Sequence, residues 1–188
     1  MYKSIFSFII ITYICCWNLF KTTNKHLTQN NDKILWSNER KLKENDFEAL
    51  PDTTNLMIAG STYSGIEITN SYFENDIPKF VVECNFIKSK SWIRIKSKDV
   101  LDHEQLHFDI DELFTRKIRK AFDSLNVKKV KDYQIYNNIY IFYGEKCETY
   151  QKLYDNQVYF NDSQQQQWIK KVGAELLRLK KYEYIPEE

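Results

Sequence analysis

Histidine, glycine and proline are all scarce in this chain of 188 residues, which has three histidines, four glycines and three prolines. Because glycine and proline are few and aromatic residues make up 15% of the chain, intrinsic disorder is excluded for most of its length. A strong charge of either sign is also missing, since the formal net charge is +1. Lysines and arginines are scattered among acidic residues without forming a basic stripe, so the composition gives no support for nucleic-acid binding.

Cysteine is limited to four residues, of which Cys15 and Cys16 lie in an apolar segment at the N-terminus. The other two, Cys84 and Cys147, have no CxxC spacing, so the sequence does not predict metal binding by cysteine. In an oxidising compartment Cys84 and Cys147 could form a disulfide, or both could be buried thiols. The sequence does not decide between these two states.

The N-terminal segment indicates export. Residues 1–20 have one early lysine followed by a mostly apolar stretch, which is typical of a secretory signal peptide or an N-terminal membrane anchor. Residues 21–33 are polar and predict a linker, and residues 34–186 predict a single folded domain. We expect a periplasmic, secreted or membrane-anchored protein at the cell envelope. Cleavage of the segment, its retention, and lipid attachment at Cys15 or Cys16 all stay open.

The most informative stretch of the chain is the pentapeptide His103-Glu104-Gln105-Leu106-His107. On a helix, residues four apart share one face, so both imidazoles can bind the same metal ion. Glu104 can then receive a proton from a metal-bound water without being a ligand itself. Zinc lowers the pKa of such a water toward about 7. The motif therefore predicts a zinc site with His103 and His107 as ligands and Glu104 as the catalytic general base.

The pattern of apolar residues around this motif predicts an α+β fold. Short β-rich runs occur at residues 57–58, 66–69, 80–86 and 92–95, separated by turn-forming residues such as Asn75-Asp76. From Asp99, the expected N-cap, apolar residues recur with a helical period as far as Phe122. A last helix is expected to begin at Asn161, Asp162 or Ser163 and to end near Tyr182. We therefore expect a small antiparallel sheet followed by three helices, with the metal motif on the first long helix.

A catalytic zinc normally has three protein ligands, and the motif supplies two. The remaining histidine, His26, lies in the predicted linker. The acidic candidates downstream are Glu145, Glu148 and Asp155, and a following helix would favour one of the two glutamates. The apolar spacing of that segment is partly helical, but the β-branched and aromatic run at residues 139–143 suits a strand equally well.

The motif and its surroundings resemble the signature of a known group of proteins. Residues 103–110, HEQLHFDI, are similar to those of an uncharacterised family of bacterial secreted proteins predicted to be zinc-dependent proteases. Weaker matches within residues 34–182 are Thr62–Ile66, Ser91-Trp92, Tyr154-Asp155 and Gln167-Trp168. The resemblance implies a zincin-like fold, a zinc-dependent protease activity and Asp155 as the third zinc ligand. That family usually has a histidine a few residues after Tyr-Asp, where this chain has Phe160.

Two functions follow from these observations. The first is an exported zinc metallopeptidase that hydrolyses a peptide or protein substrate, with His103, His107 and Asp155 binding zinc and Glu104 as the general base. The second is a catalytically inactive zincin-like module with a binding or structural role in the cell envelope. Phe160, in place of a histidine, is the feature that suggests the second function.

Three smaller points stay open at this level. The strand at residues 80–86 could be a sheet edge that binds an extended peptide, or an ordinary core strand. Tyr154 or Tyr159 could donate a hydrogen bond to an oxyanion, although packing in the core is the commoner role. The acidic residues within 109–112 could form a solvated helix face or support a ligand histidine from behind.

Overall fold

The computed structural model describes residues 32–158 and 161–186. The predicted signal or anchor segment, most of the predicted linker, Tyr159 and Phe160 lie outside the described residues. The elements in chain order are β1 (Lys33–Leu35), the 3-10 helix η1 (Glu44–Asp46), β2 (Gly60–Ser61), β3 (Ser64–Glu74), β4 (Ile77–Ile87), the 3-10 helix η2 (Lys88–Lys90), β5 (Trp92–Ile93), α1 (Lys98–Val127), α2 (Tyr133–Val158), α3 (Asp162–Arg178) and the 3-10 helix η3 (Lys180–Tyr182). The prediction of an α+β fold with a small antiparallel sheet and three helices is confirmed.

The main sheet is built on a long antiparallel hairpin of β3 and β4, with strand order β1-β4-β3. Its turn consists of Asn75 and Asp76, whose φ angles are 51° and 61°. Two-residue hairpin turns need this left-handed conformation, and Asn and Asp tolerate it better than other residues with a side chain. The strands predicted at 66–69 and 80–86 are confirmed, but both extend several residues further.

A second, two-stranded sheet pairs β2 with β5. The strand bounds predicted from the sequence for this sheet were wrong. Residues 57–58 were expected to form a strand, yet the strand begins at Gly60, which is paired with Ile93. The run at 92–95 forms a strand only at Trp92–Ile93. Strand β1 was not predicted, since it falls at the boundary of a polar segment and has only three residues.

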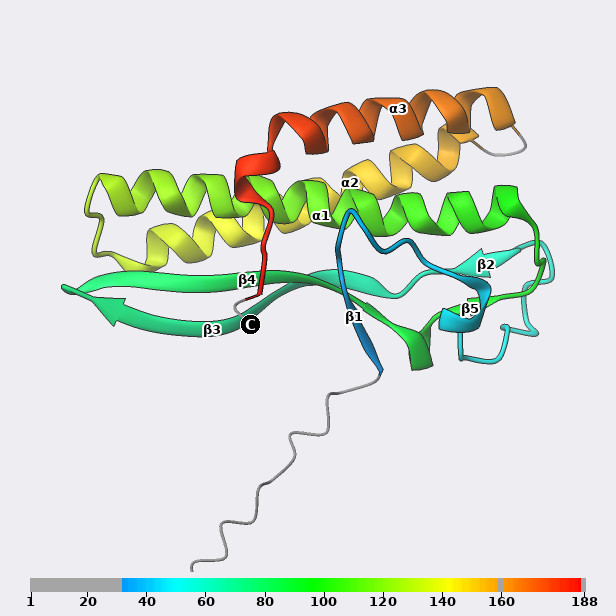
Figure 1. Cartoon of the computed structure of the whole chain (residues 1–188), viewed down its shortest axis with the longest axis horizontal. Coiled ribbons are helices and arrows are strands. Elements are labelled where there is room, and N and C mark those ends of the chain that lie inside the picture. The colour runs from blue at the N-terminus through cyan, green and yellow to red at the C-terminus, as the bar shows by residue number, and fades with distance from the viewer. Residues whose placement is uncertain (1–31, 159–160, 187–188) are drawn as a thin grey trace, which may run out of the picture. The chain divides into compact units, whose positions relative to one another are not determined.

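Helix α1 is the central element. It packs against β4, α2 and α3, and Figure 1 shows it lying along the β3–β4 hairpin with α3 on the side away from the sheet. The predicted N-cap, Asp99, is wrong by two residues, because the side chain of Ser97 accepts the hydrogen bond from Val100 N. Leu106, Ile110 and Leu113 are among the apolar residues that α1 buries in the core.

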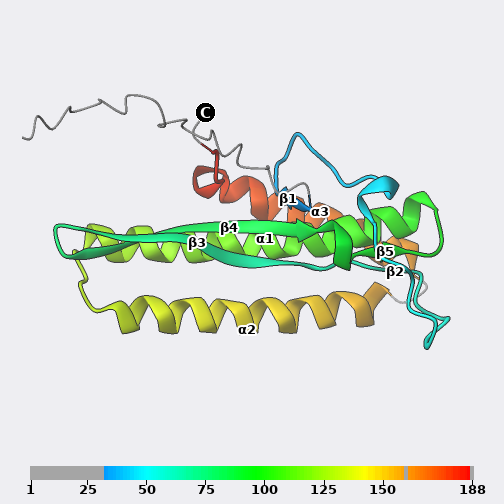
Figure 2. The same cartoon turned by 90° about the horizontal axis from the view of Figure 1, so that it is seen from below.

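Helix α2 runs alongside α1 next to the β3 edge of the sheet, as Figure 2 shows. Residues 139–143 are helical, so the alternative of a strand there is wrong. The hydroxyl of Tyr140 donates to Ile66 O, which ties α2 to β3. Helix α3 begins after Asn161, one of the three predicted caps, whose side chain accepts from Gln164 N.

A buried charge network attaches the C-terminal segment to α1. Arg116 is 2% exposed and donates to the carboxylate of Glu112 and to Leu176 O. Arg119 donates to the same carboxylate and to Tyr182 O. The position of α1 is therefore fixed from the side of α3 as well as from the sheet.

Cys84 and Cys147 are both buried and free, so the disulfide alternative is wrong and the alternative of two thiols holds. Among the described residues, none of the helices has the length and apolar character needed to cross a membrane.

Candidate metal centre

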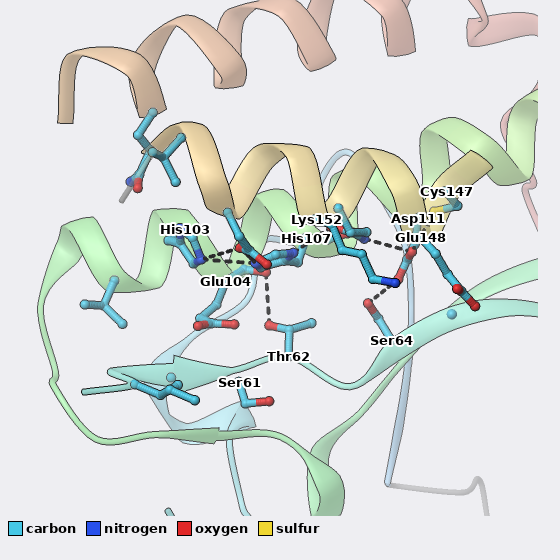
Figure 3. Close-up of a pocket in the computed structure, with 18 of the residues that line it drawn as sticks. Ser61, Thr62, Ser64, His103, Glu104, His107, Asp111, Cys147, Glu148 and Lys152 are labelled. Carbon is cyan, nitrogen blue, oxygen red and sulfur yellow. Dashed lines mark hydrogen bonds and ion pairs between the residues drawn. The ribbon is translucent and has the colours of Figure 1, made fainter. Parts of the chain in front are cut away.

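The motif residues His103, Glu104 and His107 lie on α1, on the side that faces α2 and the segment around β2 (Figure 3). The two imidazole rings are one helical turn apart, and their centroids are 4.8 Å from each other. The His103 and His107 side chains are 26% and 17% exposed, so solvent reaches both rings. This is the arrangement that the i, i+4 spacing predicts.

Asp155, from the last two turns of α2, completes a triangle of potential ligand atoms. The Nε2 atoms of His103 and His107 are 3.0 Å apart. Asp155 Oδ1 lies 3.4 Å from Nε2 of His103 and 3.0 Å from Nε2 of His107. Within the described part of the chain, these three residues are the one group of metal-binding side chains brought together in this way.

The dimensions of this triangle suit zinc. Tetrahedral zinc with ligand atoms at about 2.0–2.1 Å needs those atoms to be separated by about 3.3 Å. The three observed separations, 3.0, 3.0 and 3.4 Å, are close to this value. Two imidazole nitrogens and one carboxylate oxygen are also a ligand set found in catalytic zinc sites. The residues present therefore fit a zinc ion.

The other ring nitrogens of the two histidines have partners on α2. His107 Nδ1 lies 2.6 Å from Gln151 Oε1. His103 Nδ1 lies 3.0 Å from the hydroxyl of Tyr154, whose ring also stacks on the His103 ring. Such contacts hold a ligand histidine in one orientation and leave its other nitrogen free for a metal. Tyr154 is fully buried, so its hydroxyl supports His103 and the oxyanion role considered for it is not favoured.

Glu104 is buried on α1 beside the two histidines. Its side chain is 3% exposed, and its Oε2 atom has no hydrogen-bond partner. The carboxylate lies against Gly60, where a Cβ atom would be only 2.6 Å from Glu104 Oε1. Thr62 donates to the backbone carbonyl of Glu104, so β2 and the residues after it are held close to this part of α1.

The charges around the triangle favour a cation. Burial alone would lower the pKa of His107, but the hydrogen bond and charge of Asp155, helped by the charge of Glu104, raise the pKa to about 9. Burial would raise the pKa of the Asp155 carboxyl, but hydrogen bonds from the two histidines hold the pKa well below its usual range. The site thus stabilises positive charge next to Asp155, whether a proton or a metal carries it.

The triangle opens into a cleft of about 1110 Å³ between α1, α2 and residues 57–66. Its floor on α1 extends from Asp99 to Asp111, which corresponds to about 18 Å along the helix axis. Because β3 is at the end of the strand order, the strand that borders this cleft is an edge strand. Residues 80–86, the other candidate for a peptide-binding edge, belong to β4, which pairs with β1 only at Asn85–Ile87 and does not line this cleft.

Not every predicted ligand belongs to the site. Glu145 and Glu148 line the cleft but are not part of the triangle. The acidic residues within 109–112 do not share one environment. Asp111 and Glu112 are buried, so the alternative of a solvated helix face is wrong for these two. Glu112 pairs with arginines, whereas Asp111 contacts Gln151 behind His107.

Gly60, Gln151 and Ser64 were not predicted from the sequence as residues of the site. Gln151 precedes Asp155 by four residues, so a helical projection of α2 would have placed both on one face. The contacts of Gly60 with Glu104 and of Ser64 with Asp111 join β2 and β3 to α1 and leave no local pattern in the sequence. No known protein family, curated protein or solved structure matches this chain.

Proposed function

We propose that this protein is an exported, zincin-like zinc metallopeptidase. The observation that carries the proposal is the convergence of His103 Nε2, His107 Nε2 and Asp155 Oδ1 within hydrogen-bonding distances of one another. The buried carboxylate of Glu104, unpartnered at Oε2, comes from the same turn of α1. Two histidines alone would support a metal site of any kind, but the adjacent unpartnered carboxylate supports hydrolysis.

Each residue has a specific task in this proposal. His103, His107 and Asp155 would hold zinc, which supplies polarisation of the scissile carbonyl and a lower pKa for a water. Glu104 would take the proton from the attacking water and pass it to the leaving amine. Gly60 allows the Glu104 carboxylate to lie close to the cleft wall, since any side chain there would displace it.

The cleft favours a peptide over a compact small molecule. An extended chain advances about 3.3 Å per residue, so a floor of about 18 Å accepts about five residues. The edge strand β3 borders the cleft at Ser64–Ile66, where Ile66 O already accepts from Tyr140, and an extended peptide can bind by strand addition to the backbone groups that remain. Export is proposed on the N-terminal sequence alone.

Zinc content is the first test. The full chain is purified alongside His103→Ala and His107→Ala, with His26→Ala as the matched control, and zinc is quantified by elemental mass spectrometry. We expect about one zinc per chain for the wild type and for His26→Ala, and far less for the other two variants. A wild-type chain that takes up no zinc at neutral pH would contradict the proposal.

Hydrolysis is the second test, made on a library of fluorescence-quenched peptides. Glu104→Gln should keep its zinc and lose about 10²–10⁴-fold in rate, because a general base contributes that much. Glu148→Gln, an exposed glutamate that lines the same cleft, should hydrolyse the library like the wild type. Zinc bound without any hydrolysis by the wild type would instead support the binding or structural module.

A further inference from the structure

The carboxylate of Asp111 joins three elements of the fold one turn below His107. Its Oδ2 accepts from the Ser64 hydroxyl on β3. Its Oδ1 lies 3.1 Å from Cys147 Sγ and 3.0 Å from Gln151 Nε2, both on α2. Asp111 is 8% exposed, and burial raises the pKa of its carboxyl. All three partners are donors, so this carboxylate acts as an acceptor for each of them.

Gln151 connects Asp111 to the metal centre. Its Nε2 donates to Asp111 Oδ1 and, at 2.9 Å, to the backbone carbonyl of His107. These two acceptors fix which end of the amide is nitrogen, so the atom 2.6 Å from His107 Nδ1 is Oε1. Because an amide oxygen only accepts, His107 must carry its proton on Nδ1. Nε2 is then the ring nitrogen that faces the triangle and is left for a metal.

The hydrogen bonds between Asp111 and α2 also control the position of Asp155. Cys147, Gln151 and Asp155 are spaced four residues apart and therefore lie along one face of α2. Two of the three are hydrogen-bonded to Asp111, and the third is the carboxylate of the triangle. A shift or rotation of α2 relative to α1 would break these hydrogen bonds and move Asp155 away from the histidines.

We propose that Asp111 and Gln151 are positioning residues of the metal centre. Gln151 fixes the tautomer and orientation of His107, and Asp111 orients Gln151 and sets the register of α2 that presents Asp155. This inference rests on the proposed zinc site. It assigns a role to two residues that line the cleft but are not part of the triangle.

The zinc dissociation constant, measured by competition with a chromophoric chelator on the full chain, tests this inference. Gln151→Leu and Asp111→Asn should each weaken zinc binding about 10–100-fold, the usual effect of losing a group that supports a ligand histidine. Gln134→Leu on the exposed side of α2 and Asp123→Asn on α1 are the matched controls and should bind zinc like the wild type.

A charge-preserving exchange separates positioning from a loss of stability. In the double variant Asp111→Asn/Gln151→Glu, the new glutamate can accept from His107 Nδ1–H, and the new asparagine can donate to that glutamate. The double variant should therefore recover most of the zinc affinity that Asp111→Asn loses. In the zinc-loaded wild type and the double variant, the Nδ1 proton of His107 should give a slowly exchanging NMR signal, which Gln151→Leu should lack.

The outcomes distinguish this inference from the proposed function. If the wild type binds no zinc, both fail together. If the wild type binds zinc but Gln151→Leu binds it equally well, or the double variant is no better than Asp111→Asn, the positioning role is wrong and the zinc site stands.

Discussion

At the scale of single residues, the close contact between Gly60 and Glu104 places the carboxylate of the proposed general base against the cleft wall. A Cβ atom at position 60 would lie 2.6 Å from Oε1 and 3.0 Å from Cδ of Glu104. Real Cβ atoms do not approach so closely, so either the carboxylate or the β2 backbone would have to move. The absence of a side chain at this one position therefore determines where the proposed general base can lie.

We predict that Gly60→Ala reduces peptide hydrolysis up to about 100-fold, because a displacement of about 1 Å can cost that much when groups must be aligned. Zinc content should not change, since the three atoms nearest to the added methyl group all belong to Glu104 and none to a ligand side chain. Gly65→Ala is the matched control, because its Cβ would meet nothing within 4 Å. Equal rates for both variants would show that the Gly60 contact does not matter for catalysis.

At the scale of secondary structure elements, the sequence predicted the long elements whose apolar residues recur with a regular period, and it did not predict the bounds of the short ones. Helix α1 was predicted because apolar residues recur over many turns, and its motif was recognised because both histidines belong to one helix. Strands β1, β2 and β5 have two or three residues, too few to show any period. The run 139–143 was ambiguous because β-branched and aromatic residues suit both structures, and packing of α2 on α1 decides in favour of the helix.

The difference between a local sequence pattern and tertiary packing also explains which residues of the site could be predicted. Asp155 was favoured only through a family resemblance, because 48 residues separate it from His107. Its position beside the histidines depends on how α2 packs, which no local pattern encodes. Gln151 was not predicted, and Asp111 was considered only as one of the acidic residues within 109–112 that could support a ligand histidine, because the roles of both depend on how α1, α2 and β3 are assembled.

The start of α1 offers a direct test at this scale, since sequence and structure disagree about its cap. Ser97 accepts from Val100 N, so Ser97→Ala should lower the free energy of unfolding by about 1 kcal/mol. Asp99 contributes only its charge near the helix N-terminus, so Asp99→Asn should cost about 0.3–0.5 kcal/mol. Urea denaturation of both variants measures the difference. A larger cost for Asp99→Asn would mean that the helix is capped where the sequence pattern suggested.

At the scale of the whole described domain, α1 is the element on which all others depend. The sheet, α2 and α3 each pack on it, and Arg116 and Arg119 bind the C-terminal segment to it. The proposed zinc ligands divide between α1 and α2, so a bound ion would join these two helices directly. Zinc should therefore stabilise the fold as a whole, beyond completing a site.

The size of this effect can be predicted from linkage. A ligand that binds only the folded state at about 100 times its dissociation constant stabilises that state by about 2.7 kcal/mol. We expect the thermal unfolding midpoint of the wild type to rise on zinc addition, and to rise much less in Asp155→Asn, because that variant lacks the ligand from α2. Glu145→Gln, also on α2 but outside the triangle, should respond like the wild type. An equal rise in Asp155→Asn would show that zinc binds without joining the helices, and the third ligand would have to be sought elsewhere in the cleft.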